Sequence, residues 1–189
     1  MLISSAYDDL LEQAFTLAGK PFARLSAMIR KGNKHEVGHV QVEFSDGNAA
    51  AGVYTSEQVS TLEKTLADYS IIYKMRGTCR SNGNAREALT VTESDYFSFA
   101  QNTAAILPNY LVAQLGDLGL LFVGYRPRHW EDRLLATVLL KRRQAPEPCF
   151  RLVQTGEEPL ETVFWQRRSV QPYAMDVQEL EQYLVGGVA

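Results

Sequence analysis

The chain has 189 residues, of which 46% are hydrophobic and 22% charged, and a formal net charge of −3 at pH 7. These values are ordinary for a globular domain with a full core, and the small negative charge gives no general attraction to nucleic acid or an anionic membrane. Cys79 and Cys149 are too distant for metal-ligand spacing and too few for a secreted disulfide scaffold, so we expect a cytoplasmic protein without a metal site. We find neither a signal-peptide pattern nor an apolar run of about 18 residues that could span a membrane.

The first predicted elements are a short strand at residues 2–5 and a helix at residues 7–18, joined by a sharp turn. In open α/β sheets a turn of this kind is where ligands bind. Asp8 and Asp9 lie in the first turn of the helix and could face a ligand, although carboxylates at that place also suit the helix dipole. One face of this helix is apolar and is expected to point inward: Leu10, Leu11, Ala14, Phe15 and Ala18.

The next segment predicts a hairpin. A second short strand is expected at residues 22–25, and residues 37–44 alternate between apolar and polar side chains, as a half-buried strand does. A Ser-Asp-Gly-Asn turn follows, and residues 49–54 can return as the partner strand. The pattern predicts no function for the 37–54 insert.

The rest of the chain alternates between strands and helices, which predicts an α/β fold. The run at 119–123 is entirely apolar, as is typical of a strand buried on both faces of a parallel sheet. Pro108 should kink its helix or mark the true start. Strands are expected at 69–75, 88–92, 119–123, 149–153 and 170–173, the last at an edge. Helices are expected at 55–67, 103–115, 130–143, 160–166 and 176–185, and one more, capped by Thr92 or Ser94, runs through residue 100.

Three segments carry a resemblance to a known family. The first is Ser5-Ala6-Tyr7-Asp8-Asp9-Leu10-Leu11-Glu12-Gln13-Ala14-Phe15. The second is Lys74-Met75-Arg76-Gly77 with Leu89-Thr90-Val91-Thr92-Glu93-Ser94-Asp95-Tyr96. The third is Leu120-Leu121-Phe122-Val123-Gly124-Tyr125-Arg126 with His129-Trp130 and Arg133. In order and spacing they resemble bacterial sirtuin-like domains, which read Thr-Asn-Tyr-Asp and Asp-Leu-Leu-Glu-x-Ala-Phe, then Lys-Leu-His-Gly and Leu-Thr-x-x-Asp-Tyr, then Gly-Tyr-Ser, Asp-Trp and Arg.

The resemblance implies a Rossmann-like, mostly parallel sheet with helices on both faces. It also implies a site for NAD or ADP-ribose at the carboxyl ends of the strands, and in many members cleavage of the nicotinamide–ribose bond. Carried over position by position, the nucleotide-binding residues are Ser5, Tyr7, Asp8, Arg76, Gly77, Gly124, Tyr125 and Arg126. The resemblance assigns no metal ligand.

The chain departs from the family pattern at functional positions. Relative to the family, a single domain over 1–189 would be truncated, because the Gly-rich opening unit that holds the pyrophosphate is missing. Ala6 replaces the asparagine, Arg76 the histidine, Arg126 the serine and His129 the acid before Trp130. An arginine stays protonated and therefore cannot act as a general base. Loss of a general base typically lowers the reaction rate by a factor of about 10²–10⁴. We therefore assign no catalytic residue.

We expect a degenerate, non-catalytic sirtuin-like domain that acts by weak binding of NAD or ADP-ribose, or by assembly with a protein partner or a second copy through surface that the missing unit exposes. The resemblance suggests a place in anti-phage defence. One alternative is half of a split NAD hydrolase that another chain completes. A second alternative is a module that binds an acidic partner, and we expect a protein partner rather than nucleic acid. The basic residues that would form this surface are Arg126, Arg128, Arg133, Lys141, Arg142 and Arg143.

Two further expectations concern packing. Tyr125 and Trp130 should anchor the core rather than stack on a base. Glu93 and Asp95 should cap a helix beside Thr92 rather than form a catalytic carboxylate pair.

Overall fold

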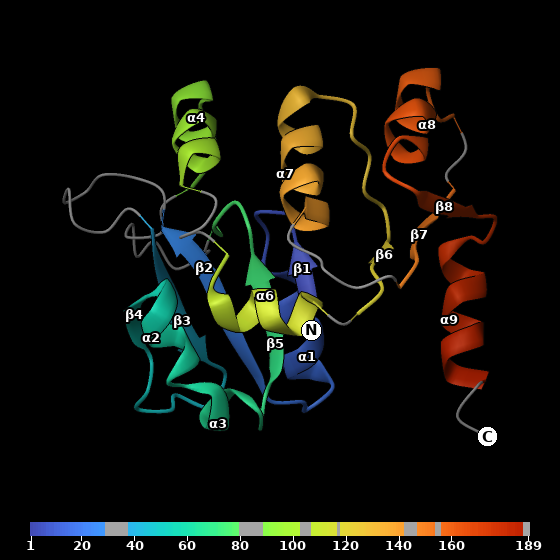
Figure 1. Ribbon diagram of the computed structural model, residues 1–189. Coiled ribbons are helices and arrows are strands. Elements are labelled where there is room, and N and C mark those ends of the chain that lie inside the picture. Colours follow the sequence, from blue (N-terminus) through green and yellow to red (C-terminus); the bar gives the residue numbers. More distant parts are fainter. Residues whose placement is uncertain are drawn as a thin grey trace. The chain divides into compact units, whose positions relative to one another are not determined.

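The computed structural model describes residues 1–28, 38–79, 89–102, 107–116, 118–141, 147–153 and 156–186. The chain divides into two compact units, Met1–Val112 and Ala113–Ala189 (Figure 1). Both units are α/β, and four of the six strand pairings in the described residues are parallel. The predicted fold class, a mostly parallel sheet flanked by helices, is therefore confirmed. That residues 1–189 form a single domain stays a prediction.

The first unit contains a five-stranded sheet with the order β1-β5-β2-β3-β4. Strands β1, β5 and β2 are parallel, with Ser4 opposite Lys74 on the first two. Strands β3 and β4 continue the sheet as an antiparallel hairpin, so the predicted hairpin is confirmed. The strand bounds are β1 Leu2–Ser4, β2 Phe22–Met28, β3 His39–Phe44, β4 Gly52–Thr55 and β5 Ser70–Lys74.

The two faces of this sheet differ in character. On one face, Leu25 of β2 pairs with Val42 of β3, and both side chains are fully buried. Side chains alternate between the two faces along a strand, and the other face carries several polar or charged side chains beside apolar ones such as Ile72. We call it the polar face, after Arg24 and Ser26 on β2, Gln41 and Glu43 on β3, and Lys74 on β5.

Helix α1 (Leu10–Leu17) covers part of the polar face and departs from the predicted pattern. Leu10 of the expected inward face is 64% exposed, whereas Glu12 is only 6% exposed. The inward side of α1 is set by the charges of the strands beneath it, because Arg24 and Lys74 both approach the carboxylate of Glu12. The prediction that this apolar face points inward is wrong at Leu10, Ala14 and Ala18, which are exposed.

The helices between residues 55 and 116 agree with the predictions only in part. The helix expected over 55–67 is two short helices, α2 (Ser56–Ser60) and α3 (Glu63–Leu66). Thr92 and Asp95 form a capping box at the start of α4 (Glu93–Gln101), which confirms the capping role of Asp95. Residues 89–92 form no strand, and residue 88 lies outside the described residues. Helix α6 (Asn109–Gly116) begins directly after Pro108, in agreement with the expectation that this proline marks the true start of the helix.

The second unit has a parallel three-stranded sheet of β6 (Leu121–Phe122), β7 (Cys149–Leu152) and β8 (Val170–Tyr173), in that order. Its helices are α7 (Trp130–Lys141), α8 (Pro159–Gln166) and α9 (Val177–Gly186). Strand β8 lies at an edge, as predicted. The core gathers apolar side chains from these elements: Phe122, Ala136, Cys149, Phe164, Trp165 and Val170.

Two packing predictions for this unit are wrong. Strand β6 is only two residues long, and Leu121 and Val123 are 49% and 47% exposed, so it is not buried on both faces. Trp130 is 42% exposed and does not anchor the core. Tyr125 does pack inward, with its ring 5.9 Å from that of Phe122 and 6.2 Å from that of Trp165. In the described part of the chain, no helix has the length and apolar character needed to cross a membrane.

Candidate functional site

The first part of the candidate site lies at the carboxyl ends of β1 and β5. These strands are parallel neighbours, so the turns that follow them lie side by side (Figure 1). The guanidinium carbon of Arg76 is 5.9 Å from the ring centroid of Tyr7 and 5.6 Å from that of Tyr96. At these distances both rings stabilise the cation. We call this group, Tyr7, Arg76 and Tyr96, the arginine–tyrosine cluster.

Backbone hydrogen bonds hold the two turns together. The carbonyl oxygen of Tyr7 accepts from the amide of Cys79 at 2.7 Å and from the hydroxyl of Thr78 at 3.2 Å. The phenol of Tyr7 donates to the carbonyl oxygen of Thr90, whose amide in turn donates to the carbonyl oxygen of Arg76 at 3.0 Å. The cluster is therefore a preformed arrangement of three chain segments.

The remaining predicted residues of this unit lie in the same two turns. Gly77 has a φ of +77°, which a residue with a side chain rarely adopts. The carboxylate of Asp8 accepts from the amide of Leu10 at 3.2 Å, so it satisfies a backbone group at the start of α1. The carbonyl oxygen of Asp8 accepts from the buried ammonium group of Lys74. Thus Ser5, Tyr7, Asp8, Arg76 and Gly77 belong to one pair of adjacent turns; that they bind a nucleotide stays a prediction.

The second part, Gly124, Tyr125 and Arg126, follows β6 in the second unit. The phenol of Tyr125 donates to the carbonyl oxygen of Asp132 at 2.6 Å. Arg126 donates through Nη2 and Nε to Glu161, at 2.7 and 3.2 Å, and through Nη2 to the carbonyl oxygen of Gly156 at 2.6 Å. The hydrogen bond with Arg126 lowers the pKa of Glu161 and raises that of Arg126. Most donors of Arg126 are thus directed at the protein.

Glu161 also affects the predicted basic surface. Its carboxylate accepts from Arg128 at 3.2 Å as well as from Arg126, and Glu161 is only 2% exposed. Two of the six predicted cations therefore share one buried carboxylate. Arg142 and Arg143 lie outside the described residues. Among the described basic residues of this set, Arg133 and Lys141 are the two that Glu161 does not bind.

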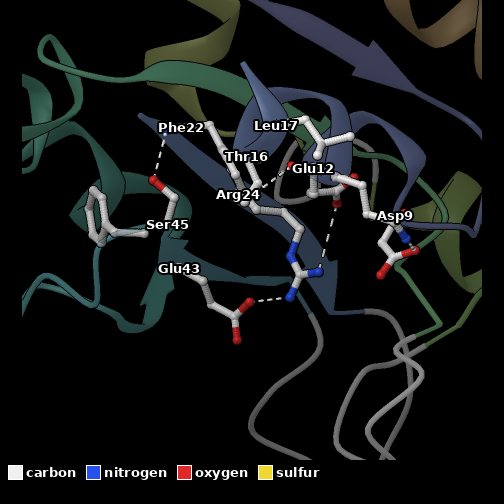
Figure 2. Close-up of a pocket in the computed structure, with 10 residues that line it drawn as sticks. Asp9, Glu12, Thr16, Leu17, Phe22, Arg24, Glu43 and Ser45 are labelled. Carbon is white, nitrogen blue, oxygen red and sulfur yellow. Dashed lines mark hydrogen bonds and ion pairs between the residues drawn. The ribbon is translucent and has the colours of Figure 1, made fainter. Parts of the chain in front are cut away.

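A charged group on the polar face was not predicted. Figure 2 shows Arg24 between the carboxylates of Glu12 and Glu43, which come from α1 and β3. Glu12 lies 3.7 Å from Arg24 Nη1 and 3.7 Å from Lys74 Nζ, and Lys74 is fully buried. One sequence signal could have indicated this group: a charged residue with an apolar residue directly before and after it in the strand segment. Arg24 and Lys74 both have such neighbours. In the described residues, no group of three or more histidine, cysteine or acidic side chains is placed to hold a metal ion.

Comparison with known proteins gives one match. Residues 1–173 match the family model described as a SIR2-like domain, so the match extends over both units. No curated protein and no solved structure matches the chain.

Proposed function

The chain belongs to the SIR2-like domain family, and from this premise we propose that it is a non-catalytic member that binds ADP-ribose or NAD weakly at the carboxyl ends of β1 and β5. The arginine–tyrosine cluster carries the proposal. Arg76 stands where the resemblance expects a histidine, and two tyrosine rings stabilise its positive charge. A permanently protonated group cannot take a proton from a ribose hydroxyl or a water.

The chemistry of these residues fits a phosphate-bearing ligand. A guanidinium offers a planar fork of donors that matches phosphate oxygens, and the adjacent rings give an apolar wall for a sugar or base. Arg76 would hold the phosphate, while Tyr7 and Gly77 shape the turns. The resemblance also assigns Gly124 and Tyr125 of the second unit to nucleotide binding, and this assignment stays a prediction. We give Arg126 a positioning role instead, because Glu161 and Gly156 take up its donors.

The test is thermal unfolding with millimolar ADP-ribose or NAD, with released nicotinamide measured in the same samples. A ligand present at one hundred times its dissociation constant stabilises the folded state by about 2.7 kcal/mol. We expect both ligands to raise the Tm, Arg76→Ala to abolish the rise, and no nicotinamide to form. Arg167→Ala is the matched control, since Arg167 is an exposed arginine of the second unit that the resemblance does not assign to nucleotide binding. Nicotinamide release by the purified chain would refute the non-catalytic assignment, and an unchanged Tm would refute binding.

We also propose that the protein assembles with a protein partner or a second copy. The support is the apolar surface of α9, where Tyr183, Leu184 and Val185 are 70%, 61% and 72% exposed. Exposed apolar patches commonly mark interfaces. Light scattering of the purified chain should show a mass above one protomer that Leu184→Glu lowers and Glu181→Gln does not. A monomer at every concentration would exclude self-association. A cytoplasmic location and a role in anti-phage defence belong to the same proposal and rest on cysteine usage and family resemblance.

A further inference from the structure

Lys74 is a fully buried lysine at the carboxyl end of β5, two residues before Arg76 of the proposed nucleotide site. Its ammonium group donates to the carbonyl oxygen of Asp8 and lies 3.7 Å from the carboxylate of Glu12. A charge is stable inside a protein only where it is paired and hydrogen-bonded. These two partners therefore fix the place of the ammonium group.

The carboxylate of Glu12 holds the ammonium group from the side of α1. Glu12 is 6% exposed and lies 3.7 Å from Nη1 of Arg24 on β2 as well as from Lys74. Arg24 also pairs with Glu43 of β3 (Figure 2). The charges thus alternate in sign from Glu43 to Lys74, and each has an opposite charge beside it. Such an arrangement keeps its members in place, because moving one of them leaves a buried charge unpaired.

The other partner of the ammonium group is the backbone of the turn after β1. This turn carries Tyr7, whose ring centroid is 5.9 Å from the guanidinium carbon of Arg76. Asp8 is the next residue, so a hydrogen bond to its carbonyl oxygen restrains the backbone directly after Tyr7. The donor comes from the same strand end that leads into Arg76. One lysine therefore connects the two turns whose side chains meet in the arginine–tyrosine cluster.

We propose that Lys74 is a positioning residue of the nucleotide site. Its ammonium group, held by Glu12, fixes the turn after β1 so that the ring of Tyr7 lies against the guanidinium of Arg76. Because Lys74 is fully buried, it acts through this turn and not by contact with a ligand. Its effect on ligand binding rests on the proposed function, whereas its effect on the turn is measured without a ligand.

Amide hydrogen exchange, followed by NMR on the full chain, measures the effect on the turn. The amide of Cys79 donates to the carbonyl oxygen of Tyr7 at 2.7 Å, so its exchange rate reports how often the turn opens. Loss of a hydrogen bond from a charged donor shifts such an equilibrium about tenfold or more, so Lys74→Met should speed Cys79 exchange by that factor. The amide of Ser70, at the opposite end of β5, donates to the carbonyl oxygen of Pro21 at 3.1 Å and should exchange at an unchanged rate.

Calorimetric titration with ADP-ribose measures the effect on binding. Only the closed turn presents Tyr7 beside Arg76, so Lys74→Met should raise the apparent dissociation constant, by up to about tenfold. Lys64→Met is the matched control, because it makes the same change at an exposed lysine of α3. It should alter neither the dissociation constant nor the exchange rate of the Cys79 amide.

A second variant allows for the possibility that Lys74→Met does not fold, as judged by circular dichroism. Lys74→Met combined with Glu12→Gln removes one positive and one negative charge, and it should still show fast Cys79 exchange because the Asp8 carbonyl lacks its donor. Unchanged Cys79 exchange, or an equal acceleration at Cys79 and Ser70, overturns the positioning role. Faster Cys79 exchange with an unchanged dissociation constant overturns the role in binding. If the unmodified chain does not bind ADP-ribose, the proposed function is refuted, and the exchange rates still decide whether Lys74 fixes the turn.

Discussion

The carboxylate of Glu161 accepts hydrogen bonds from two arginines, Arg126 and Arg128, and from the amide of Glu158 at 3.1 Å. A group that is 2% exposed and has this many donors fixes the conformation of the loop after β6. The loop belongs to the third segment of the family resemblance. A single buried acid on α8 thus holds both Arg126 and Arg128 in place.

Glu161→Gln should destabilise the protein at pH 7 by about 1–3 kcal/mol, because it replaces charge-assisted hydrogen bonds with weaker ones. The folded-state pKa of Glu161 is lowered from the ordinary value of 4.5, chiefly by the hydrogen bond from Arg126. Its contribution is therefore present above pH 4.5 and is lost as the pH falls through the lowered pKa. Denaturant unfolding at pH 7 and at several values below 4.5 measures this. The variant should show a shallower loss of stability in acid, and Glu181→Gln, an exposed acid of α9, should behave like the unmodified chain.

At the scale of elements, the capping box of α4 is the clearest stabilising contact that the sequence predicts. The hydroxyl of Thr92 accepts from the amide of Asp95 at 3.3 Å, and the carboxylate of Asp95 accepts from the amide of Thr92 at 2.8 Å. Thr92→Ala should lower the free energy of unfolding by about 1 kcal/mol, the usual cost of losing an N-cap. Urea denaturation tests this, with Ser94→Ala in the first turn of the same helix as control. An equal effect of the two changes would show that Thr92 does not act as a cap.

The element-scale predictions succeeded where the signal was local. Caps, turns and strand alternation placed α4, the β3–β4 hairpin and α6 because each depends on neighbouring residues. The failures depended on distant ones. The apolar run at 119–123 predicted a central strand, but β6 pairs with β7 alone among the described strands, so Leu121 stays half-exposed. The apolar stripe of α1 predicted its inward face, but the ionic partners of Glu12 come from β2 and β5.

At the scale of the whole molecule, motif order was more informative than periodicity. The three family segments predicted the α/β class, and the family match over residues 1–173 confirms the family. They also placed Tyr7 and Arg76 in adjacent turns. They did not predict the group of Glu12, Arg24, Glu43 and Lys74, because its members come from four elements and no two are close in the sequence. Which charged side chains pair across a sheet cannot be predicted before the register of its strands is known.

The strand order β1-β5-β2 has a consequence for the order in which the chain can be assembled. The strand that separates β1 from β2 is synthesised last of the three, since it spans Ser70–Lys74. While the chain emerges from the ribosome, β2 can pair with β3 once Phe44 has left the exit tunnel. β1 must wait for a partner that lies about seventy residues downstream, as Leu2 pairs with Ile72. Until then the turn that bears Tyr7 has no neighbouring turn, so the arginine–tyrosine cluster is completed only after the sheet has closed around β5.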